Sequence, residues 1–161
     1  MKKILILFQF ILLFVIVVLF NPLSNRVITY YYSKKLNLNS TYFYRQINSE
    51  SSFRCFAYSY ASAIGPGQIT FDTARYLHKD IKKWQLWLPW INIRTSGEYM
   101  IYLLKKYKQN YSLALAAYNW GETNVDKKLK YHQINVVRHI NYRFLFKNVT
   151  ETNTFLLKIM E

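Results

Sequence analysis

The sequence predicts a mainly α-helical protein, with one helical domain preceded by a single N-terminal membrane-spanning or signal segment. An apolar run extends from Ile4 to Phe20, and Gln9 is its one polar residue. Farther along the chain, apolar residues recur at spacings of three and four, as they do on one face of a helix. No stretch shows a convincing strand alternation, and 161 residues fit one domain.

The N-terminal run of about 17 residues is close to the ~20 that span a bilayer. A cleaved signal peptide has a shorter apolar core and a small-x-small cleavage site. The following residues, 21–26, offer neither Ala-x-Ala nor a cysteine for lipid attachment. We therefore expect residues 1–26 to form an uncleaved signal anchor, with a cleaved signal peptide as the alternative. Lys2 and Lys3 would keep the N-terminus in the cytoplasm and place the remainder outside the membrane.

The next residues, 27–40, are expected to form a juxtamembrane linker to a domain over residues 41–161. Three consecutive tyrosines, Tyr30 to Tyr32, suit the interface beside a membrane span, and Lys34 and Lys35 follow them.

The charge and cysteine content exclude several classes. Formal net charge is +14, or +12 without Lys2 and Lys3, which implies anionic surroundings or a solvated cationic surface. Nucleic acid, a membrane surface and an anionic wall polymer are the candidates, and export argues against nucleic acid. Cys55 is the single cysteine, so no intrachain disulfide is possible. One cysteine and three scattered histidines make no zinc set, and we predict no metal or cofactor.

The first helix of the domain is predicted over residues 41–49, where Phe43 and Ile47 are four apart. It places Glu50 at or near its C-terminal end, where the helix dipole disfavours a carboxylate anion. Phe53 and Phe56 could also desolvate the side chain. Both effects would raise the pKa of Glu50, as a general acid requires.

A break follows at 65–67, where Gly-Pro-Gly interrupts any regular structure. Thr70 or Asp72 is a possible N-cap of the next helix. Further helices are expected over residues 92–109, over residues 112–118 with Gly121 ending the segment, and over residues 152–160. The stretch 136–146 is a weaker candidate. The aromatic stretch containing Trp84, Trp87 and Trp90 serves either core packing or the stacking of sugar rings.

Acid chemistry has few candidates, because the chain has only eight carboxylates. Glu50 alone is flanked by short hydroxyl residues, aromatic residues and a glycine-containing loop. It is therefore the candidate catalytic acid, and an ordinary surface glutamate is the alternative.

The order of four motifs over residues 41–160 resembles that of the soluble-lytic-transglycosylase type of catalytic domain, in the goose-type lysozyme superfamily. That family has Glu-Ser, then Gly-Ala-x-Gly-Leu-Met-Gln-Ile and Thr-Ala, then Ala-Tyr-Asn-Ala-Gly, then Glu-Thr before the last helix. The matching runs here are Glu50-Ser51-Ser52-Phe53, then Ala63-Ile64-Gly65 with Gln68-Ile69 and Thr73-Ala74, then Ala117-Tyr118-Asn119-Trp120-Gly121, then Glu151-Thr152.

The resemblance implies a lysozyme-like helical fold around a sugar-binding groove. It implies cleavage of the β-1,4 bond between N-acetylmuramic acid and N-acetylglucosamine in peptidoglycan, with formation of 1,6-anhydro-muramyl ends. Glu50 matches the single catalytic glutamate, acting as acid and then as base. Ser51, Gln68, Tyr118 and Asn119 match residues that contact substrate or hold the site.

The sequence departs from the family pattern at several positions near these motifs. They are Ser62 for the first Gly, Pro66-Gly67 for Leu-Met, Phe71 for Pro, Leu88 for Asp, and Trp120 for a small residue. Glu50, Gln68, Tyr118 and Asn119 are intact, so we expect activity.

The predicted partners are peptidoglycan glycan strands and, through residues 4–20, the cytoplasmic membrane. The predicted location is the bacterial cell envelope, with the catalytic domain facing the periplasm or wall. A hydrolytic muramidase of the same fold is a close alternative. A non-catalytic wall-binding or wall-assembly protein is another, and a basic nucleic-acid or membrane-surface binder is a third. The oligomeric state cannot be predicted from the sequence.

Overall fold

The computed structural model describes residues 2–161 and confirms the mainly α-helical class. Within these residues no β-strand forms, and isolated bridges join Tyr58 to Ile64 and Ile64 to Ile69. The α-helices are α1 (Lys2–Leu19), α2 (Pro22–Lys35), α3 (Ser40–Ser51), α4 (Phe71–Leu77), α5 (Pro89–Lys106), α6 (Tyr111–Trp120), α7 (Glu122–Tyr131) and α8 (Thr150–Met160). Two 3-10 helices, η1 (Lys83–Trp87) and η2 (Tyr142–Phe146), complete the set.

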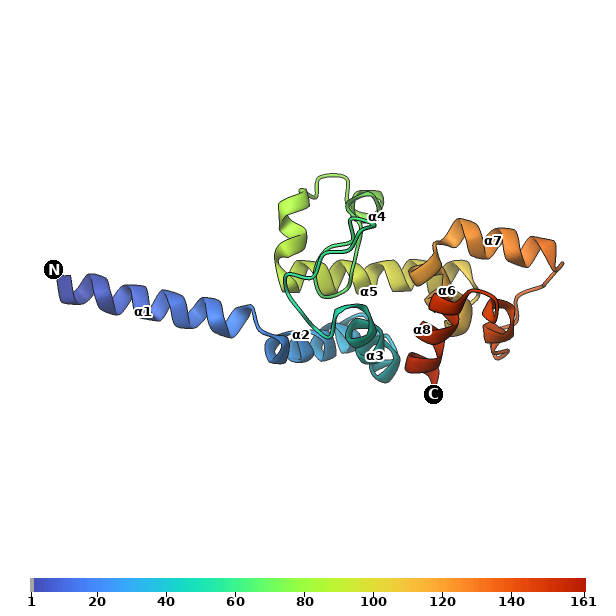
Figure 1. Ribbon diagram of the computed structural model, residues 1–161, viewed down its shortest axis with the longest axis horizontal. Coiled ribbons are helices and arrows are strands. Elements are labelled where there is room, and N and C mark those ends of the chain that lie inside the picture. The colour runs from blue at the N-terminus through green and yellow to red at the C-terminus, as the bar shows by residue number, and fades with distance from the viewer. Residues whose placement is uncertain (1) are drawn as a thin grey trace.

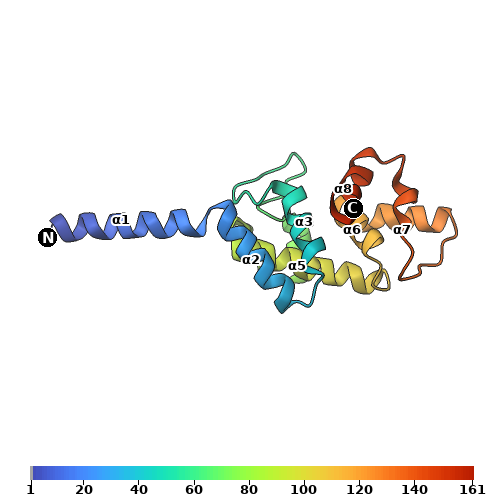
Figure 2. The same cartoon turned by 90° about the horizontal axis from the view of Figure 1, so that it is seen from below.

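Helix α1 extends away from the folded body, and both views show it as a single straight arm (Figures 1 and 2). None of its side chains is buried, and its mean hydropathy over 18 residues is 2.6. By length and composition it is long and apolar enough to cross a membrane.

Residues 27–35, expected to belong to a juxtamembrane linker, instead form the larger part of helix α2. Asn21 caps it by accepting hydrogen bonds from the backbone of the first turn, and proline follows the cap. Asn25, Thr29 and Ser33 lie four residues apart and are fully buried, on the side that packs against α3 and α5. The segment is therefore part of the folded body. Its fully buried stripe is polar, and beside it Ile28, Tyr32 and Leu36, also four residues apart, are partly buried against the core.

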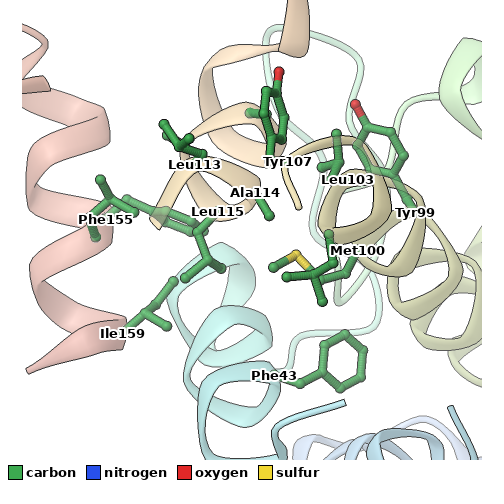
Figure 3. Close-up of a cluster of buried hydrophobic side chains, with 14 of the residues drawn as sticks. Phe43, Tyr99, Met100, Leu103, Tyr107, Leu113, Ala114, Leu115, Phe155 and Ile159 are labelled. Atoms are coloured by element: carbon green, nitrogen blue, oxygen red, sulfur yellow. The ribbon is translucent and has the colours of Figure 1, made fainter. Parts of the chain in front are cut away.

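The core lies where α3, α5, α6 and α8 meet (Figure 3). Phe43 comes from α3, Met100 and Leu103 from α5, Leu115 from α6 and Ile159 from α8, and each is almost completely buried. The apolar faces predicted within residues 41–49, 92–109, 112–118 and 152–160 supply these side chains. Thr70 caps α4, as one of the two expected alternatives, and Gly121 ends α6 as expected.

An irregular segment, residues 57–69, crosses the N-terminal part of α5 and is held there by one side chain. Asn92 on α5 accepts from the backbone N–H of Gly67 at 2.8 Å. The same amide donates to the carbonyls of Ile64 at 2.7 Å and Leu86 at 2.9 Å. Asn92 is fully buried, so these bonds satisfy groups that have no access to water.

The two glycines of this segment permit the close approach. Gly65 has φ 72°, and a Cβ there would lie 2.5 Å from the Asn92 amide nitrogen. A Cβ on Gly67 would overlap the hydroxyl of Ser96, one turn after Asn92 on α5. Gly65 and Gly67 therefore lie directly against the Asn92 and Ser96 side chains of α5.

We predict that Asn92→Ala lowers the free energy of unfolding by about 2–4 kcal/mol, because it leaves the buried N–H of Gly67 without a partner and removes a hydrogen bond from the carbonyls of Ile64 and Leu86. Asn124→Ala is the matched control: Asn124 on α7 is exposed, and its side chain donates to the carbonyl of Trp120 at the end of α6. We expect it to change stability by less than about 0.5 kcal/mol. Urea titration of the full chain in mild detergent measures both, and equal losses would contradict the role given to Asn92.

Candidate active site

A cleft of about 780 Å³ lies between the C-terminal ends of α3 and α6, residues 59–70 and α8. Glu50, Gln68, Tyr118 and Asn119, four of the five residues singled out from the sequence, line this cleft. Its other lining residues are Ser49, Ser59, Ala61, Ala63, Thr70, Thr150, Glu151, Thr154, Phe155 and Lys158. The fold thus brings together residues that are up to 109 positions apart, from Ser49 to Lys158.

Glu50 lies in the last turn of α3 and is half-buried at the cleft wall. Burial raises the pKa of its carboxyl group from 4.5 to about 8, and the nearby negative charge of Glu151 adds to the rise. Glu50 is therefore mostly protonated at neutral pH. The position at a helix C-terminus, where the dipole disfavours an anion, acts in the same direction.

Ser51 differs from the expected contact with substrate. It is buried, its hydroxyl donates to the carbonyl of Pro66 at 2.7 Å, and it is not among the lining residues. The bond fastens the end of α3 to the segment that Asn92 holds. The chain then turns sharply, because Ser52 and Phe53 both adopt left-handed φ angles, of 55° and 63°.

Tyr118 and Gln68 are also tied to this segment. The hydroxyl of Tyr118 donates to the carbonyl of Gly67 at 2.6 Å. Burial raises the pKa of Tyr118 well above 10, and the negative charge of Glu50 adds to the rise, so the phenol remains a hydrogen-bond donor. Gln68 folds its side chain back and donates to the Gly65 carbonyl at 2.9 Å.

Asn119 connects two walls of the cleft. Its side-chain oxygen accepts a hydrogen bond from the hydroxyl of Thr152 at 2.8 Å, so the end of α6 is joined to the first turn of α8. This bond holds the residue after Tyr118 in place. It also sets the position of Glu151, the neighbour of Thr152, on the far wall.

Two polar residues near Glu50 received no role in the sequence analysis. Glu151 is an exposed lining residue of the cleft; its Glu-Thr motif was matched in the sequence, but no role in the site was given to it. Gln46 lies one turn before Glu50 on α3 and is fully buried. Within residues 2–161 neither polar atom of its side chain has a hydrogen-bond partner. In the sequence, the spacing of four residues between Gln46 and Glu50 indicates that both lie on the same face of α3.

Of the aromatic residues expected to pack the core, stack on sugars or desolvate Glu50, Trp87 packs against the core, and Phe53 is buried within it. Trp84, Trp87 and Trp90 are not among the residues that line the cleft. Phe56 is exposed and stacks on Phe20, at the end of α1. In the part of the chain that the structure describes, no three His, Cys, Asp or Glu side chains are grouped to hold a metal ion.

The comparisons with known proteins agree with this geometry. The structure is similar to the X-ray structure of an inactive mutant of the lytic transglycosylase Slt from Pseudomonas aeruginosa, with a TM-score of 0.71 and 25% sequence identity. The match covers 84% of this chain and 22% of that one, so the chain spans about a fifth of the length of Slt. None of the curated proteins is significantly similar in sequence.

The helical body therefore has the lysozyme-like fold of Slt, as the sequence predicted. The sequence pattern of the transglycosylase SLT domain matches residues 28–140, which include α2 and the segments that carry Glu50, Gln68, Tyr118 and Asn119. The start of the match within α2 agrees with the packing of that helix in the folded body. The chain belongs to the transglycosylase SLT domain family.

Proposed function

We propose that this chain is a peptidoglycan lytic transglycosylase in which Glu50 acts first as general acid and then as base. The observation that carries the proposal is a protonated carboxyl group, with a pKa of about 8, at the wall of a cleft large enough for sugar rings. The Slt mutant that resembles this chain is inactive and has one glutamate exchanged for glutamine, which supports the choice of a glutamate.

In the first step, Glu50 donates its proton to the oxygen of the β-1,4 bond between N-acetylmuramic acid and N-acetylglucosamine. The bond to the anomeric carbon breaks, and N-acetylglucosamine leaves as the free alcohol. The substrate's own acetamido group stabilises the positive charge that develops on the muramyl ring, as in glycosidases that depend on assistance from the substrate. A carboxyl group that is protonated at neutral pH is suited to this donation.

In the second step, the Glu50 carboxylate accepts the proton of the muramyl C6 hydroxyl. That oxygen attacks the anomeric carbon and closes the 1,6-anhydro ring, so Glu50 returns to its protonated state and no water is consumed. The high pKa also makes the carboxylate a better base than an exposed glutamate would be.

The other lining residues would position the substrate. Tyr118, whose hydroxyl donates to Gly67 and can still accept a hydrogen bond, would orient the acetamido group through its N–H, and Gln68 would contact the glycan strand. Asn119 would keep Tyr118 in place through its bond to Thr152. Ser51 would act through the segment that it holds at Pro66.

We further propose that α1 anchors the protein in the cytoplasmic membrane and that the catalytic domain faces the periplasm or wall. The exposed apolar surface of α1 and its basic start support this orientation. A signal peptide that is removed after export is the alternative.

One observation favours a second candidate function. Glu151 places a second carboxylate in the cleft, and hydrolytic glycosidases use a pair of carboxylates. A hydrolytic muramidase would use Glu151 to activate water and would release reducing ends in place of anhydro ends. The two products differ by one water.

Digestion of purified peptidoglycan by the full chain in mild detergent tests the reaction. We expect the wild type to release anhydro-muropeptides, identified by mass spectrometry. We expect Glu50→Gln to lower the rate by at least about 100-fold, because the isosteric amide can neither donate nor accept the required proton. Unchanged binding of Glu50→Gln to sacculi would show that its fold is intact.

Reducing ends from the wild type would replace the transglycosylase with the muramidase. Equal rates for the wild type and Glu50→Gln would remove Glu50 from the mechanism. No product from either protein, with binding intact, would favour a wall-binding protein that retains the fold.

The pH dependence tests the protonation state of Glu50. Because the protonated form begins the reaction, kcat/KM on soluble glycan strands should fall as the pH rises through about 8. We expect Glu151→Gln to remain active and to move this fall to lower pH, since it removes a charge that raises the pKa of Glu50. The movement should be smaller than the shift caused by burial, which is the larger cause. Loss of activity in Glu151→Gln would support the muramidase.

A further inference from the structure

A group of aromatic side chains surrounds the place where α1 joins the folded body. We call it the aromatic collar; it consists of Phe20, Phe56, Tyr58, Trp84, Trp87 and Trp90. The ring of Phe20 stacks on Phe56, with 5.8 Å between ring centroids, and meets Trp90 edge-on at 6.1 Å. Trp87 lies 6.4 Å from Phe56 and 6.0 Å from Tyr58, and Trp84 precedes it on η1.

Much of the collar faces outward. The side chains of Phe56, Tyr58 and Trp84 are 66%, 56% and 59% exposed. Large apolar side chains that gather on one exposed face usually contact a partner or a membrane. None of these three side chains lines the cleft. Trp87 packs against the core, but neither the core nor the proposed reaction accounts for the three exposed side chains.

The position of the collar indicates its partner. Phe20 follows directly on α1, and in Figure 1 η1 and the N-terminal end of α5 lie at the end of the body from which α1 departs. Helices α6, α7 and α8 lie at the opposite end in both views (Figures 1 and 2). A bilayer spanned by α1 would therefore meet the body at the collar.

The chemistry of this end fits a lipid headgroup layer. Tryptophan and tyrosine prefer the boundary between hydrocarbon and water, where their rings are apolar and their N–H or O–H groups are hydrated. Arg26, Arg54, Lys82 and Lys83 are exposed on the same segments and would meet the phosphates of anionic lipids. In the first 71 residues the one acidic side chain is Glu50, which faces the cleft.

We infer that the aromatic collar docks in the interfacial layer of the bilayer that α1 spans, as a second membrane contact of the domain. The inference rests on the proposed anchoring by α1 and is independent of the proposed reaction. Residues 57–64 carry Tyr58 in the collar and Ser59, Ala61 and Ala63 in the cleft wall. Docking therefore fixes the orientation and height of the cleft above the membrane, so that it receives the glycan strands nearest to the bilayer.

The tryptophans provide the test, because three of the four belong to the collar and Trp120 belongs to α6. The full chain is inserted in vesicles of phosphatidylethanolamine and phosphatidylglycerol that carry a nitroxide label near the headgroup. Wild type, Trp84→Phe and Trp120→Phe are compared by the fraction of tryptophan emission that the labelled lipid quenches. Trp84 is exposed, so its replacement leaves the fold intact, and circular dichroism checks all three proteins.

Docking predicts opposite changes in the two variants. More than half of the wild-type emission should be quenched; Trp84→Phe should lower that fraction, and Trp120→Phe should raise it. If the protein co-floats with the vesicles but the quenched fraction is the same in the wild type and both variants, docking is overturned and the anchor stands. Failure to co-float would overturn both. Neither result depends on peptidoglycan cleavage, so failure of the proposed reaction would be recognised separately in the digestion experiment.

Discussion

The bonds of Asn92 to the segment over residues 57–69 are the constraint on which the rest of the site depends. One buried amide holds Ile64, Gly67 and Leu86 on α5. Two carbonyls of this segment then accept hydrogen bonds: that of Pro66 from the Ser51 hydroxyl at the end of α3, and that of Gly67 from the Tyr118 hydroxyl near the end of α6. Two helix ends that approach from different directions are thereby fixed to one piece of backbone, with Glu50 and Tyr118 beside the same cleft.

This rigid frame carries a group that opposes folding at high pH. The pKa of Glu50 is about 8 in the folded chain and 4.5 without burial, so the folded state binds more protons between these values. Its contribution to stability is fully present below pH 4.5 and is lost as the pH rises to about 8. Each unit by which the pKa is raised corresponds to about 1.4 kcal/mol of stability lost when Glu50 ionises at high pH. The bonds around Asn92 and the core formed by α3, α5, α6 and α8 offset this loss. A half-buried acid is thus kept protonated by the packing that positions it.

The helices with apolar faces were predictable from sequence: Phe43 with Ile47 marks α3, and Leu103 with Tyr107 marks α5. Helix α2 was not predicted: its fully buried residues Asn25, Thr29 and Ser33 are polar, and the series Ile28, Tyr32 and Leu36 was placed in a juxtamembrane linker. Helix α7 was not predicted, because its sequence is mostly polar and charged. Glu50, Tyr118 and Asn119 were found through their motifs, and the structure places them in one cleft. The bond of Ser51 to Pro66, the presence of Glu151 in the cleft and the aromatic collar depend on contacts between distant segments, which no local pattern contains.

Direct titration of Glu50 tests the account most closely. The full chain, labelled with ¹³C at glutamate side-chain carboxyl groups, is followed by NMR in detergent micelles from acid to alkaline pH. The resonance that is absent in Glu50→Gln identifies the residue. A midpoint near pH 8 is the predicted result, because burial and the charge of Glu151 both disfavour the carboxylate. A midpoint near 4.5 would contradict the account, since Glu50 would then be ionised at neutral pH and could not begin the reaction as an acid.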